Sequence, residues 1–122
     1  MTTKQWVGGR DVLVLAGDGG VIDSPQAAAD VIGEAFSAGL RTVVIPVERL
    51  DPSFFRLASG LAGEVLQKFV NYGFTVAIVG DIDSRVAGSK PLADFVRESN
   101  KGTQVWFVPD AAALAARLAS GR

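Results

Sequence analysis

Four short apolar runs, separated by segments with helical spacing, most constrain what this chain can fold into. The runs show little alternation of apolar and polar residues, so each predicts a strand that is buried on both faces of a sheet. Buried parallel strands need crossover connections, and the segments between the runs carry apolar residues at the spacing of a helix. The chain is therefore predicted to be an α/β domain with a mainly parallel sheet of four core strands and about four helices. We expect the core strands near residues 12–16, 42–46, 74–79 and 104–108.

A β-hairpin is predicted at the start of the chain. Trp6 and Val7 precede the turn Gly8-Gly9-Arg10, and the first apolar run follows. The hairpin adds an antiparallel edge strand to the sheet. The 122 residues contain no linker and no repeat, so we expect one domain over residues 1–122. Right-handed crossovers are expected to place the helices mainly on one face of the sheet.

Composition and charge argue against nucleic acid and membrane as partners. The 12 basic and 13 acidic residues are spread along the chain and leave a net charge of −1, which argues against nucleic-acid binding. No run approaches the roughly 20 apolar residues of a membrane span. The first residues lack the apolar core of a signal peptide, and the cytoplasm is the expected location.

Histidine and cysteine are both absent from the sequence. This excludes histidine-based triads, thiol catalysis and the usual zinc sites. We therefore expect no metal, no cofactor and no enzymatic activity. A carboxylate-based enzyme is kept as a second alternative.

The predicted helix that begins at Ser59 has two different sides. Leu61, Ala62, Val65, Leu66, Phe69 and Val70 share one stripe that is expected to be buried. The opposite side is polar, and its residues are Glu64, Gln67, Lys68 and Asn71. One interpretation is a solvated face with a Glu64–Lys68 ion pair. The other is a binding surface for a partner or ligand.

Two further positions have both a structural and a functional interpretation. Ser59 is expected to cap its helix, and it is also a candidate phosphosite. Asp81 follows the third core strand, at the edge where open α/β sheets bind ligands, and Asp83 and Glu48 are expected near the same edge. The structural alternative for Asp81 is an aspartate turn that stabilises the loop. Ser99 and Asn100, at the end of a helix, are expected to form local backbone bonds.

Two stretches carry a resemblance to a known family. The first runs from Phe54-Phe55-Arg56-Leu57 through Gly60 to Phe69 and on to Gly80-Asp81. The second combines Glu98-Ser99-Asn100-Lys101-Gly102 with Val105-Trp106-Phe107-Val108. With these stretches the chain resembles the bacterial family catalogued as domain of unknown function 4180, from about Val12 to Leu118. That family implies no particular activity.

The hairpin, the αβ alternation and the terminal helix are also similar to the STAS domain of anti-sigma-factor antagonists. In that domain a serine in an Asp-Ser-Ser/Thr-Gly-Leu motif is phosphorylated by a kinase, which switches partner binding. Here Ala58-Ser59-Gly60-Leu61 stands at a comparable place, with Leu57 and Ala58 where the motif has its acidic residue. The resemblance implies a STAS-like two-layer fold and a protein partner, such as a regulator or a kinase.

The function expected from the sequence is a non-catalytic regulatory or protein-interaction module. Its expected binding residues are Glu64, Gln67, Lys68, Asn71 and Asp81. The alternative is a sensor that binds a nucleotide or another anion at the carboxyl ends of the parallel strands. The sequence leaves the oligomeric state open, a homodimer included.

Overall fold

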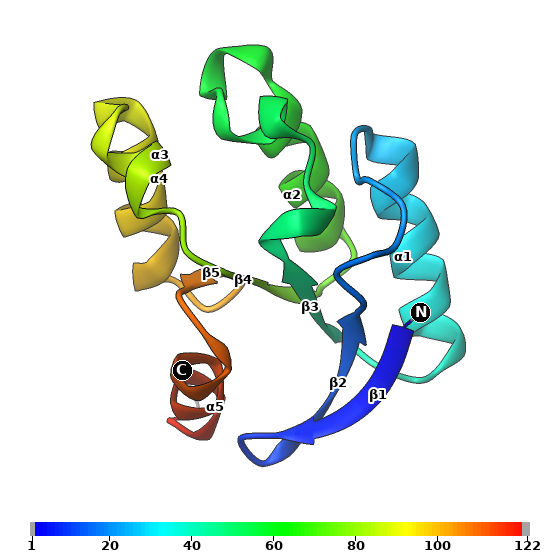
Figure 1. The fold of residues 1–122 in the computed structure, drawn as a ribbon. Coiled ribbons are helices and arrows are strands. Elements are labelled where there is room, and N and C mark those ends of the chain that lie inside the picture. The colour runs from blue at the N-terminus through cyan, green and yellow to red at the C-terminus, as the bar shows by residue number, and fades with distance from the viewer. Residues whose placement is uncertain (1, 121–122) are drawn as a thin grey trace.

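The computed structural model describes residues 2–120, in which the apolar runs form one five-stranded sheet (Figure 1). The strand order follows the chain, with β1 antiparallel to β2 and all other neighbours parallel. The predicted fold class, a mainly parallel sheet with an antiparallel N-terminal edge strand, is confirmed. The strands are Thr2–Val7 (β1), Arg10–Leu15 (β2), Thr42–Pro46 (β3), Thr75–Val79 (β4) and Val105–Val108 (β5).

Within residues 2–120, five α-helices connect or follow the strands. The short helix α3 was not predicted, because five residues are too few to show a helical period. Three short 3-10 helices lie between β3 and α2, at residues 47–49, 52–55 and 57–59. The α-helices are Pro25–Ser37 (α1), Leu61–Asn71 (α2), Asp83–Ala87 (α3), Lys90–Lys101 (α4) and Ala111–Ala119 (α5). None of the helices within residues 2–120 has the length and the hydropathy that crossing a membrane requires.

The sequential strand order explains where the helices lie. Each parallel strand is added on the same side of the previous one, so right-handed crossovers bring α1, α2 and the α3–α4 pair to one face. Helix α5 follows β5 and packs on the opposite face (Figure 1). The helices therefore cover mainly one face, as predicted, and α5 adds a partial third layer.

Each face of the sheet has its own core. On the helical face, Val43 and Val76 are fully buried and pack with Ile32 of α1 and Phe69 of α2. On the other face, the core is smaller and surrounds Trp106, which is 1% exposed. The residues of this second core are Val12, Val44, Ala77, Trp106, Val108, Leu114 and Leu118.

The hairpin turn between β1 and β2 also holds α5 in place. Gly8 and Gly9 have φ angles of 58° and 94°, the left-handed values that a two-residue hairpin turn needs. A Cβ atom on Gly8 would lie 2.6 Å from the Ala115 carbonyl oxygen and from Leu118 Cβ. Only glycine lets α5 approach the turn this closely.

Candidate functional site

The chain leaves β4 and β5 toward opposite faces of the sheet. After β4 it enters α3 on the helical face, whereas after β5 it enters α5 on the other face (Figure 1). Neighbouring parallel strands whose connections diverge in this way leave a crevice at their carboxyl ends, which is the usual ligand site of open α/β sheets. The residues after β4 and β5 are therefore the first place to search for a site.

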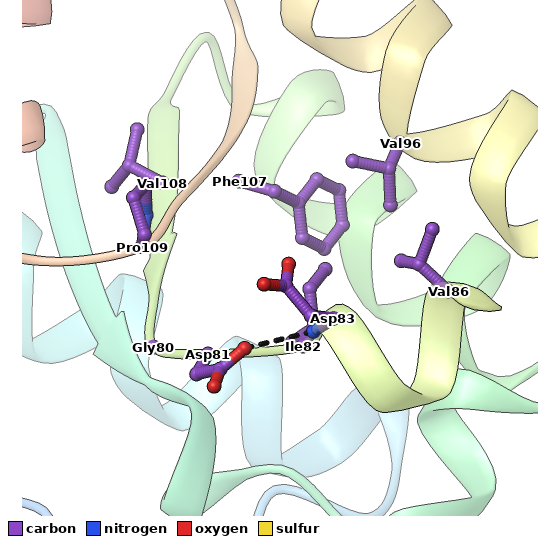
Figure 2. A pocket seen from close by; sticks show the side chains of 9 residues that line it. All are labelled: Gly80, Asp81, Ile82, Asp83, Val86, Val96, Phe107, Val108 and Pro109. Atoms are coloured by element: carbon purple, nitrogen blue, oxygen red, sulfur yellow. Dashed lines mark hydrogen bonds between the residues drawn. The ribbon is translucent and has the colours of Figure 1, made fainter.

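A cavity of about 230 Å³ lies at this crevice. Figure 2 shows its lining, which combines a short acidic segment with apolar walls from α3, α4 and β5. The lining residues are Gly80, Asp81, Ile82, Asp83, Val86, Val96, Phe107, Val108 and Pro109.

The two carboxylates of the cavity have different surroundings. Asp81 Oδ1 accepts a hydrogen bond from the backbone N–H of Asp83 over 2.9 Å, so the predicted aspartate turn is present. Asp83 is the first residue of α3, and Figure 2 shows its carboxylate directed toward the space beside the Phe107 ring. Both side chains are exposed, and within residues 2–120 neither forms an ion pair. The mouth of the cavity is therefore acidic.

The apolar wall is well packed, and no basic residue among residues 2–120 lines the cavity. Phe107 is 7% exposed, and its ring packs edge to face against Phe95 with the centroids 6.0 Å apart. Arg85, the basic residue of α3, lies over the ring of Phe55 at 4.6 Å and does not line the cavity. The site thus places two negative charges beside a fixed hydrophobic surface.

Gly80 closes the base of the cavity and needs to be glycine. Its φ angle is 151°, and a Cβ atom would lie 2.6 Å from Cγ2 of Val47. Glu48 lies at the same carboxyl edge of the sheet, as expected, just after β3, but it lines a separate apolar groove of about 350 Å³ on the face that carries α5. The two hollows share Gly80 but not their charged residues.

The polar side of α2 is separate from this cavity. Glu64, Gln67 and Asn71 are exposed and Lys68 is half-buried, and all four line one shallow groove with Pro25 of α1. Gln67 Nε2 donates to Asn71 Oδ1 over 2.7 Å. Glu64 and Lys68 form no ion pair with each other. The structure therefore brings four of the predicted binding residues together and places Asp81 apart from them.

The prediction that Ser59 is the N-cap of α2 is wrong. Ser59 ends a 3-10 helix, and the capping position falls on Gly60, whose φ angle is 80°. Ser59 Oγ still accepts a hydrogen bond from the N–H of Leu61 over 3.2 Å, and it donates one to the carbonyl of Ser53 over 2.7 Å. The hydroxyl is exposed but already has two partners.

Sequence reasoning missed the apolar half of the cavity. Phe107 was assigned to a strand by its apolar run, but the run does not show which face each side chain occupies. Val96 comes from α4, before that strand, and Pro109 from the loop after it. The order of helices and strands does not by itself locate this crevice, because it does not show on which face of the sheet α5 packs.

The fold and the cavity define a small α/β protein with a hollow at the carboxyl ends of two diverging parallel strands. The chain matches the family described as domain of unknown function (DUF4180) over residues 7–118, and it belongs to that family. No curated protein matches the chain. No solved structure matches it either, so the likeness to the STAS domain stays a prediction.

Proposed function

We propose that the protein is a non-catalytic binding module that takes a small organic cation in the cavity between the ends of β4 and β5. The observation that carries this proposal is the pair Asp81 and Asp83 at the mouth of an otherwise apolar cavity. An ammonium group would lie beside the carboxylates, and an attached ring or hydrocarbon would pack against Phe107 and Val96. The site residues are thus Asp81, Asp83, Val96 and Phe107.

The charge of the cavity decides between ligand classes. A nucleotide or another anion, the class expected from the sequence, would meet two carboxylates and no basic lining residue. A hydrated metal ion would leave the apolar walls unused. An organic cation uses both halves of the site.

The proposal is tested by titrating labelled protein with arylalkylamines and following backbone amide signals by NMR. Phenethylamine is compared with hydrocinnamate, which has the same ring and a carboxylate in place of the amine. We expect the amines to shift the signals of Gly80, Asp83 and Phe107, and the carboxylate to leave them unchanged. Asp83→Asn should weaken amine binding by about fivefold, the effect of losing one exposed charge pair.

Glu98→Gln is the matched control because it removes the same charge from an exposed position on α4 that does not line the cavity. It should bind phenethylamine like the unchanged protein. Equal binding of phenethylamine and hydrocinnamate would exclude a cation site. Shifts confined to other parts of the chain would exclude this cavity.

A second candidate function is protein binding through the polar side of α2. The observation that favours it is the common groove formed by Glu64, Gln67, Lys68 and Asn71, whose side chains are not needed for the core. A regulator or a kinase would be such a partner, and phosphorylation of Ser59 would break its bond to Ser53 next to this helix. The test is affinity capture with the Gln67→Ala/Asn71→Ala variant. A partner that binds both forms equally would contradict this use of α2.

A further inference from the structure

The two edge strands of the sheet, β5 and β1, differ in the hydrogen-bond partners at their outer edges. At the outer edge of β5, the side chain of Asn100 pairs with the outward backbone groups of Phe107. Its Oδ1 accepts from the N–H of Phe107 over 2.7 Å, and its Nδ2 donates to the Phe107 carbonyl over 3.2 Å. At the other edge, β1 pairs with β2 alone within residues 2–120. An open edge strand is a template for another strand unless bulges, prolines, charged side chains or covering segments block it.

Strand β1 carries only one of these devices, the charged residue Lys4, and its register with β2 is unbroken by a bulge. It has six residues, no proline and one charged residue, Lys4, whose Nζ lies 3.8 Å from Asp11 Oδ2. Trp6 lies on the same strand and is 70% exposed, the largest exposure among the big apolar side chains of the described residues. A tryptophan at an open strand edge favours burial against a partner.

We propose that β1 pairs with β1 of a second copy of this chain, in antiparallel register about a two-fold axis at Gln5. The two-fold axis is perpendicular to the sheet. Two residues that lie opposite each other across the new strand pair therefore have their side chains on the same face of the joined sheet. This register places Lys4 opposite Trp6 of the second copy, Gln5 opposite Gln5, and Thr3 opposite Val7. The two sheets then continue into each other, and the proposal is independent of the proposed ligand site.

The backbone selects between registers. Val7 and Arg10 close the two-residue turn, so ladder bonds to β2 fall on Val7 and, by alternation, on Gln5 and Thr3. The N–H and C=O groups of Lys4 and Trp6 then point away from β2. In the proposed register these outward groups meet each other in two symmetry-related Lys4–Trp6 pairs.

The side chains agree with that choice. An axis at Lys4 would place two lysines directly opposite each other, which is unfavourable. An axis at Gln5 instead sets each Lys4 ammonium beside the Trp6 ring of the other copy, in reach of a cation–π contact. Since two short strand edges bury less surface than a standard interface, we expect the association to be weak and reversible.

A single-cysteine variant tests the register directly, because the natural chain contains no cysteine. Opposite residues of a non-hydrogen-bonded antiparallel pair have Cα atoms about 4.5 Å apart, within disulfide range. Gln5→Cys should therefore form a covalent dimer under mild oxidation. In this register, Lys4 of one copy lies two positions away from Lys4 of the other copy. Lys4→Cys should therefore stay largely monomeric. Equal cross-linking of the two variants, or none in either, would overturn the register.

The second measurement uses the chain without cysteines. Sedimentation velocity over a range of concentrations should show a reversible dimer, and Lys4→Pro should weaken it by about tenfold or more by removing an outward N–H. Proline is tolerated on an edge strand where the N–H faces away from the sheet, and circular dichroism verifies that the variant folds. Glu98→Gln, an exposed change on α4 at the other edge of the sheet, is the control that should leave the dimer unchanged. A monomeric natural chain at millimolar concentration, or an unaffected dimer in a folded Lys4→Pro variant, would overturn the proposal.

Discussion

At the outer edge of β5, one amide side chain pairs with both backbone groups of a single strand residue. Asn100 is the next-to-last residue of α4, and it pairs with both backbone groups of Phe107, seven residues further along the chain. The expectation that Asn100 serves local bonds was therefore too narrow: its bonds join a helix to the sheet. Phe107 also lines the candidate cavity, so the hydrogen bonds of Asn100 help to hold one wall of the site in place.

Asn100→Ala should lower the free energy of unfolding by about 1–3 kcal/mol, because it leaves a partly buried N–H and C=O without partners. Asn100→Asp keeps the acceptor for the Phe107 N–H but places a carboxylate against the Phe107 carbonyl, so it should restore little of this loss. Urea unfolding measures both changes. Ser99→Ala, at the neighbouring position, is the control. A loss below about 0.5 kcal/mol for Asn100→Ala would show that water replaces the amide equally well.

At the scale of the element, α2 shows the separation of its two sides most clearly. Phe69 is fully buried and packs edge to face on Phe74 with the ring centroids 6.1 Å apart, whereas Gln67 is exposed. Phe69→Ala should therefore cost about 3–5 kcal/mol by leaving a cavity in the main core. Gln67→Ala should cost no more than about 0.5 kcal/mol, since it removes one exposed hydrogen bond to Asn71.

Chemical denaturation of the two variants tests this contrast. A large loss for Gln67→Ala would assign the polar side of α2 to folding rather than to binding. The second candidate function would then lose its basis.

The local patterns of the sequence predicted the elements better than the site. Strands buried on both faces leave uninterrupted apolar runs, and α2 leaves a clear stripe, so both were located to within about two residues. The start of α2 was misplaced because Gly60 adopts a left-handed conformation that ends the preceding 3-10 helix. The cavity depends on α5 crossing to the other face. Leu114 and Leu118 predict that α5 buries one side, but they do not indicate which face of the sheet it covers.

At the scale of the whole molecule, stability at low pH depends on carboxylates that are held ionised in the folded chain. A hydrogen bond from the Ser53 hydroxyl, and then one from the Ser53 N–H, lower the pKa of Asp51. Hydrogen bonds from Arg97 and Lys90 lower the pKa of Asp94. Because both pKa values are depressed by folding, this stabilisation is present above the usual aspartate pKa of about 4 and is lost as the pH falls through the folded values.

Salt and substitution should distinguish the contribution of Asp51 to stability from that of Asp94. Raising the salt concentration should weaken the contribution of Asp94, whose main partners are charged and exposed, and should affect Asp51 less, because its main partner is a neutral hydroxyl. Ser53→Ala and Asp51→Asn should each reduce the loss of stability below about pH 4, because the first removes the hydroxyl that contributes most to the lowered pKa of Asp51 and the second removes the titrating carboxyl itself. The double variant should show little further reduction, since both changes act on one interaction. Urea midpoints measured from neutral pH to acid provide the comparison, and additive effects of the two substitutions would show that Ser53 is not the main cause of the shift at Asp51.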